Sequence, residues 1–177
     1  MSLFGQQVEQ WRTFYSTLAS VCATLVGLIF VAMSLNTDVV RRTQDAELMG
    51  IARNTFGHFL IVMMTALVFL VPGVSPAGVA LALLTLGTTW MFGTLRRLQS
   101  LRRSASSPAE GSPSHLGRLR SFGMSFGGGL GLTAVGVALA LGATSALYWL
   151  MPVLAILLAA ATATAWALLA RLRGMPR

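Results

Sequence analysis

Long apolar stretches separated by short polar connections dominate the pattern of the chain. A membrane-spanning helix needs about 20 mostly apolar residues, because the hydrocarbon core is about 30 Å thick and each residue rises about 1.5 Å. The stretches that meet this requirement without any Asp, Glu, Lys or Arg are 13–35, 55–74, 77–95, 122–143 and 145–170. Their residues do not alternate as barrel strands would. The pattern therefore predicts an all-α bundle of five transmembrane helices, in a single membrane domain over residues 1–177.

Arginine sorts the polar connections into two sets. Five spans place segments 36–54, 96–121 and 171–177 on one side of the membrane, and these hold every arginine except Arg12. The positive-inside rule therefore predicts an N-terminus outside and a C-terminus in the cytoplasm. The fourth span is rich in glycine, which leaves a re-entrant or broken segment open as an alternative.

Composition narrows the class of protein further. Hydrophobic residues make up 55% of the chain, charged residues only 10%, and the mean hydropathy is +0.72. The formal net charge of +8 is carried by arginine without any lysine, which fits a GC-rich bacterial genome. We therefore expect a multi-pass protein of the bacterial cytoplasmic (inner) membrane. Nucleic acid is excluded as a partner, since the basic residues stand at the ends of apolar runs and form no separate domain.

Two cytoplasmic connections have distinct characters. Asp38 is placed to cap a helix that starts at Val39 and continues into the second span. Residues 100–116 read as a flexible loop, because Ser, Ala, Pro and Gly cannot bury enough apolar area to order it. Arginines flank this loop and are expected to contact anionic headgroups at about 1 kcal/mol each, or to act only as topology anchors. They are Arg96, Arg97, Arg102, Arg103, Arg118 and Arg120.

The first span carries the most regular pattern in the chain. Small and hydroxyl-bearing residues recur at spacings of three and four and form one narrow line along the helix, which we call the hydroxyl stripe. Its members are Thr13, Thr17, Ser20, Thr24, Gly27, Val31 and Ser34. Such a stripe suits tight helix packing. It equally suits the wall of a water-filled pathway in an oligomer, with Val31 as a constriction.

Small residues also form ladders in the fourth and fifth spans. Membrane helices use such ladders to bring their backbones close together, within a bundle or between subunits. The fourth span has Gly123, Gly127 and Gly131, beside a second ladder of Ser121, Ser125, Gly129 and Thr133. The fifth span has Ala155, Ala159 and Ala163.

His58 is the only histidine within a span, about one turn inside the cytoplasmic edge after Arg53. An ionisable group inside the membrane suggests a proton sensor, and a histidine bonded to a carbonyl or hydroxyl is the alternative. Cys22 reads as a small apolar residue. No span contains a carboxylate and the two histidines lie far apart in sequence, so we expect no catalytic residues, metal site or cofactor, and no enzyme.

The run from Trp11 to Tyr15, followed by Ala23 to Asn36, resembles the opening helix of a family of small uncharacterised bacterial multi-pass membrane proteins, some of them automatically named protease modulators. This resemblance implies no specific activity. Residues 23–35 are also similar to the first helix of Orai-type channels, which lines a homo-oligomeric pore. The Orai motif ends in a selectivity glutamate, whereas Ser34 and Leu35 stand at that place here, so calcium selectivity is not implied.

Two functions from different classes remain. In the first, several copies form a homo-oligomeric channel for ions or small solutes, lined by the first span. In the second, the protein is a non-conducting scaffold or regulator that packs against another membrane protein. Both have the lipid bilayer as a partner, with anionic headgroups on the cytoplasmic side.

Overall fold

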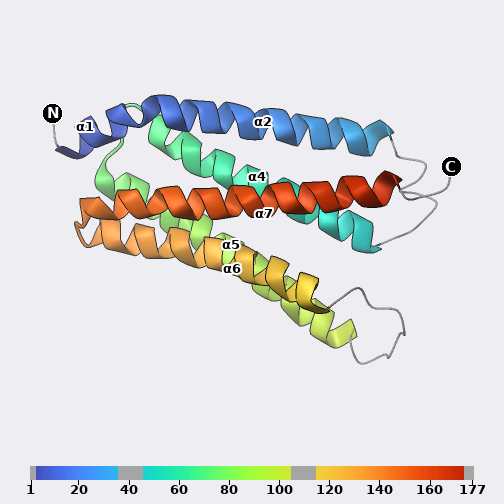
Figure 1. Cartoon of the computed structure of the whole chain (residues 1–177). Helices are drawn as coiled ribbons and strands as arrows, with labels where there is room; N and C mark the ends of the chain where they lie inside the picture. The colour runs from blue at the N-terminus through green and yellow to red at the C-terminus, as the bar shows by residue number, and fades with distance from the viewer. Residues whose placement is uncertain (1–2, 36–45, 105–114, 174–177) are drawn as a thin grey trace. The chain divides into compact units, whose positions relative to one another are not determined.

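The computed structural model describes residues 3–35, 46–104 and 115–173, and these residues form helices and short turns without any strand. The expectation of an all-helical chain is confirmed for this part of the sequence. The helices are α1 (Leu3–Gln10), α2 (Arg12–Leu35), α4 (Ala46–Leu70), α5 (Pro76–Ser104), α6 (His115–Ala140) and α7 (Leu147–Arg173), with a short 3-10 helix η1 (Thr144–Ala146) before α7 (Figure 1).

Among the described residues, four segments are long and apolar enough to cross a membrane. They are Arg12–Leu35, Ala52–Leu70, Pro76–Arg96 and Thr144–Trp166. In α6 the apolar part, Ser125–Ala140, is shorter. Helices of this length and composition are those of a multi-pass membrane protein.

The ends of the helices differ from the predicted spans for local reasons. α4 already begins at Ala46, and it ends at Leu70 because Pro72 cannot continue the helix and Gly73 takes a positive φ of 68°. α5 begins at Pro76, a favoured first helical position, and continues to Ser104, well into the segment expected to be a loop. Residues 105–114 of that loop lie outside the described residues, as do Asp38 and Val39.

The glycine-rich segment predicted as the fourth span is helical as far as Ala140, and its last residues form a turn in which Gly142 takes a positive φ of 87°. α6 runs from His115 to Ala140 without interruption, although glycine in a helix interior is unfavourable by about 1 kcal/mol relative to alanine in water. Contacts between helices therefore have to compensate for this low propensity. Most of these contacts are with α5.

The chain divides into two compact units, Met1–Gly73 with Leu157–Arg177, and Val74–Ile156. In the first unit, α2 and α4 pack against each other in antiparallel directions (Figure 1). In the second unit, α5 and α6 form an antiparallel pair, with η1 and the beginning of α7 following α6.

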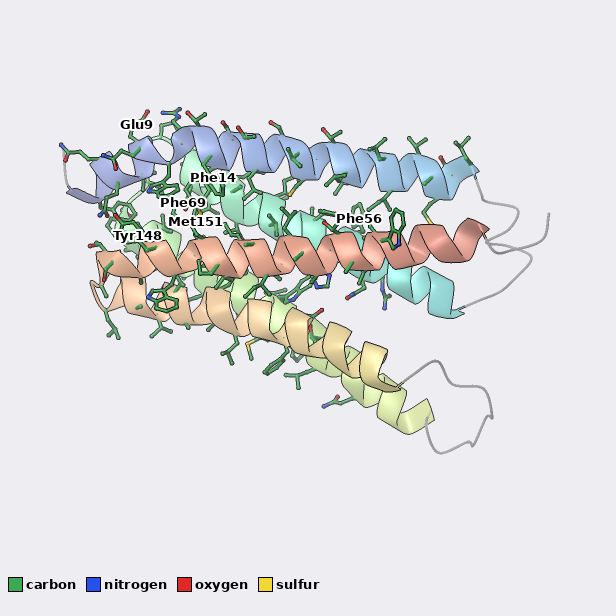
Figure 2. The ribbon with its side chains drawn as sticks, viewed as in Figure 1. Glu9, Phe14, Phe56, Phe69, Tyr148 and Met151 are labelled. Atoms are coloured by element: carbon green, nitrogen blue, oxygen red, sulfur yellow. The ribbon has the colours of Figure 1, made fainter. Side chains whose placement is uncertain are left out.

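Aromatic stacking fixes the register of α2 against α4. The rings of Tyr15 and Phe69 are nearly parallel, at 9°, with centroids 4.4 Å apart, and Phe14 meets Tyr15 edge-on at 5.5 Å. Figure 2 shows Phe14 and Phe69 at the same end of the two helices. Further along this contact, Cys22 of α2 and Val62 of α4 are both fully buried.

The contact between α5 and α6, which we call the α5–α6 seam, brings two backbones together. A methyl group placed on Gly87 of α5 would lie 2.9 Å from the backbone nitrogen of Thr133 and 3.0 Å from the carbonyl oxygen of Gly129, with Thr133 Oγ1 closer still. The indole N–H of Trp90 donates to the carbonyl oxygen of Ser125, at 3.0 Å. At the other end, a methyl group on Gly136 would lie 3.1 Å from the backbone nitrogen of Leu84. Only glycine permits this spacing.

Candidate functional site

The hydroxyl stripe lies on the side of α2 that faces away from α4. The fully packed residues of α2 are Tyr15, Ala19 and Cys22. Val31 follows Cys22 by nine residues, which is about two and a half helical turns, so the two side chains point in opposite directions. All seven members of the stripe are exposed. Packing against α4 within the first unit therefore leaves the entire stripe uncovered.

The hydroxyl groups of the stripe bond to their own helix. Thr17 Oγ1 donates to the Thr13 carbonyl oxygen, Ser20 Oγ to Ser16 and Thr24 Oγ1 to Ser20, each at 2.9 Å. Ser34 Oγ donates in the same way to the Val31 carbonyl oxygen. Because these hydrogens are engaged, the hydroxyls offer oxygen atoms as acceptors to whatever lies against the stripe. Such a surface is compatible with water or with the backbone of another helix.

Gly27 leaves a shallow notch in the middle of the stripe. No atom lies within 4 Å of the position that its Cβ would occupy. On either side of the stripe the helix carries exposed bulky residues, among them Leu28 and Phe30. α2 is also the least buried of the four segments long enough to cross a membrane. It therefore has one face committed to α4 and a small, polar face opposite.

His58 is fully buried in α4. Its Nδ1 lies 2.7 Å from the carbonyl oxygen of Asn54, and Thr55 and Thr65 of the same helix are also fully buried. Counting eleven residues from the stacked pair of Tyr15 and Phe69 brings His58 level with Val26, near the middle of α2. The depth of His58 in the membrane, about one turn inside the edge by its spacing from Arg53, stays a prediction. A bond to a carbonyl is the alternative that the sequence left open, and proton sensing stays a prediction.

The glycine ladder of α6 and the alanine ladder of α7 fall largely on exposed faces. A methyl group on Gly131 would lie 2.7 Å from Val153 Cγ2 of α7. Gly123 and Gly127 are exposed with nothing within 4 Å of a Cβ position. The three alanines of α7, Ala155, Ala159 and Ala163, are exposed as well. Close packing at these exposed positions stays a prediction about contacts beyond a single chain.

The arginines around the loop lie at one end of the antiparallel α5–α6 pair. Arg96 is exposed, and its Cζ lies 4.3 Å from the centroid of the Phe92 ring. α5 continues six residues beyond it to Arg102, about 9 Å further along the axis. The structure does not describe the side chains of the others, which are Arg97, Arg102, Arg103, Arg118 and Arg120. Their contact with anionic lipid stays a prediction.

Among the described residues, no group of three or more His, Cys, Asp or Glu residues is placed to hold a metal ion. Cys22 is a free thiol buried in the α2–α4 contact. The hydroxyl stripe is thus the most distinctive surface in the described part of the chain.

No protein-family model, curated protein or solved structure matches the chain.

Proposed function

We propose that this protein is a homo-oligomeric channel of the bacterial inner membrane, in which copies of α2 line a pathway for ions or small solutes. The observation that carries the proposal is the position of the hydroxyl stripe, exposed along α2 and directly opposite the face packed on α4. α4 packs against the opposite face of α2 and supports it. Assembly around an axis would bring the stripes of several copies together.

Lipid is the least suitable neighbour for this stripe. Small side chains such as Ser20 and Gly27 make few dispersion contacts with acyl chains, whereas the bulky Leu28 and Phe30 beside them make many. Hydroxyl oxygens gain a further advantage against water or a polar partner, since lipid offers them no hydrogen bond. In the proposed pore, Val31 is the apolar constriction and the hydroxyls line the rest.

Five spans, with the N-terminus outside, complete the proposed arrangement. The apolar part of α6 is short, but α6 pairs with α5 from Gly136 beside Leu84 to Ser125 beside Trp90. We propose that α6, paired along this length with a long apolar neighbour, crosses the bilayer with it. The loop arginines then lie in the cytoplasm. Arg12, the one arginine left outside, forms an ion pair with Glu9 at 3.3 Å.

Cysteine accessibility tests the proposal. In a Cys22→Ala background, we expect single cysteines at Ser20, Thr24, Gly27, Val31 and Ser34 to react with a charged, membrane-impermeant thiol reagent in the assembled protein. We expect this reaction because, in the proposed pore, water reaches each of these positions. Mass spectrometry after labelling in liposomes measures the fraction modified at each position.

Two matched positions on α2 control this experiment. Ala19 is buried against α4, and Phe30 is exposed on the bulky flank of the helix, so cysteines at both are expected to stay unmodified. Reaction that follows the stripe and spares these two supports a pore. Equal labelling of Phe30 and the stripe, or no labelling along the stripe at all, contradicts it.

The alternative is a non-conducting scaffold or regulator whose stripe packs against another membrane protein. The open notch at Gly27 favours this candidate, because it permits close approach of a foreign helix. A stoichiometric partner retained after gentle detergent extraction would support the alternative. A purified assembly made only of this chain would count against it.

A further inference from the structure

α7 exposes large aromatic residues at both ends of its apolar segment. Trp149 and Trp166 are each 71% exposed, and Tyr148 beside Trp149 is 60% exposed. Figure 2 shows Tyr148 near the beginning of α7. Between the two tryptophans the exposed residues are small or apolar, including Pro152, Ile156 and Thr162.

The spacing of these aromatic residues matches the thickness of a bilayer. Trp149 and Trp166 are seventeen residues apart on one continuous helix, which corresponds to about 26 Å at 1.5 Å per residue. The hydrocarbon core is about 30 Å thick, and Trp and Tyr concentrate at its two boundaries. Each tryptophan therefore falls at or just inside one boundary.

Charge supplies an independent argument for the same placement. Arg171 and Arg173 follow Trp166 in the sequence of α7, and the helix contains no acidic residue. A tryptophan followed within two turns by arginines is the order expected where a helix leaves the hydrocarbon and meets anionic headgroups.

We infer that the exposed face of α7 is a lipid-contacting surface, with Trp149 at one headgroup boundary and Trp166 at the other. The alanines at positions 155, 159 and 163 lie on this face. The exposed tryptophans at its two ends anchor the face at the two bilayer boundaries, so that lipid covers it and not the backbone of a second copy. This inference does not depend on whether the protein conducts.

Depth-dependent fluorescence quenching tests the inference. The full-length protein is reconstituted in vesicles of phosphatidylcholine carrying bromine either near the headgroup or near the bilayer centre. We expect Trp149→Tyr and Trp166→Tyr each to remove roughly a third of the quenching by the shallow bromine, since Trp11, Trp149 and Trp166 share the boundary zones. Tyrosine retains the boundary preference, so insertion is preserved in both variants.

Trp90→Tyr is the matched control, because Trp90 is half-buried in the α5–α6 seam and donates to Ser125. We expect this variant to keep the shallow quenching of the unmodified chain. The inference is overturned if neither α7 variant lowers the shallow quenching, as would happen if protein covered this face. It is also overturned if the quenching they remove comes from bromine at the bilayer centre.

Discussion

Replacing Gly87 by leucine is expected to separate α5 from α6 and to lower the free energy of unfolding by about 3 kcal/mol. A Cβ at this position would lie 2.9 Å from the backbone nitrogen of Thr133 and 3.0 Å from the carbonyl oxygen of Gly129. These are backbone atoms of a neighbouring helix, so no side-chain rotation can make room for leucine. The α5–α6 seam would have to open, and the bond from Trp90 to Ser125 would be strained. Unfolding in mixed micelles, followed by circular dichroism, measures the change.

Gly93 provides the control on the same helix. Nothing lies within 4 Å of its Cβ position, so Gly93→Leu adds the same side chain without a clash. We expect the free energy of unfolding of this variant to stay within about 0.5 kcal/mol of that of the unmodified protein, as is usual for substitutions away from tight contacts. Equal loss of stability in both variants would mean that the seam does not depend on close approach at Gly87.

Replacing Gly27 by phenylalanine is expected to reduce solute or ion flux by about tenfold or more while the fold stays intact. The notch at Gly27 is open within a single chain, with no atom within 4 Å of its Cβ position. Phenylalanine therefore fits on an isolated copy of α2. In the proposed pore, each copy would project an aromatic ring into the pathway one turn from the Val31 constriction. Flux into liposomes, measured with the same amount of inserted protein, gives the ratio.

A substitution at Leu28, next to Gly27, distinguishes blocking of the pore from a general effect of side-chain size. Leu28 is 61% exposed but belongs to the bulky flank of α2, so Leu28→Phe is expected to leave flux close to that of the unmodified protein. The pore is contradicted if Gly27→Phe conducts normally, and equally if both variants lose flux together.

Hydrophobic length alone predicts the five long helices, although not α1 or η1, because a bilayer demands runs of a certain length and composition. The ends of helices depend on local chemistry, and the sequence is informative there only in part. Pro72 and Gly73 end α4 as turn residues should, whereas hydropathy falls at the arginines after Leu95 although α5 continues to Ser104. Helix extension beyond the membrane edge depends on weak propensities that hydropathy does not register.

Periodicity predicts which residues share a face, but it does not tell which face is covered. The spacing of Thr17, Ser20 and Thr24 established the stripe, while its exposure followed only once Tyr15 was found against Phe69. The same limit applies to α6, where Gly129 meets α5, whereas no described atom of another helix lies within 4 Å of the Gly127 Cβ position. The sequence pattern does not single out Gly87, for another reason. It is a single small residue without a four-residue repeat, and its importance lies in the helix that packs against it.

Determining the symmetry of the purified particle in lipid nanodiscs, by electron microscopy at a resolution that identifies helices, would decide between a pore and its alternatives. A pore predicts a rotationally symmetric assembly of this chain alone, with α2 as the helix nearest the axis and Ser20, Thr24 and Gly27 turned inward. A monomer, or an oligomer in which α2 lies at the lipid-exposed rim, would contradict the proposed function.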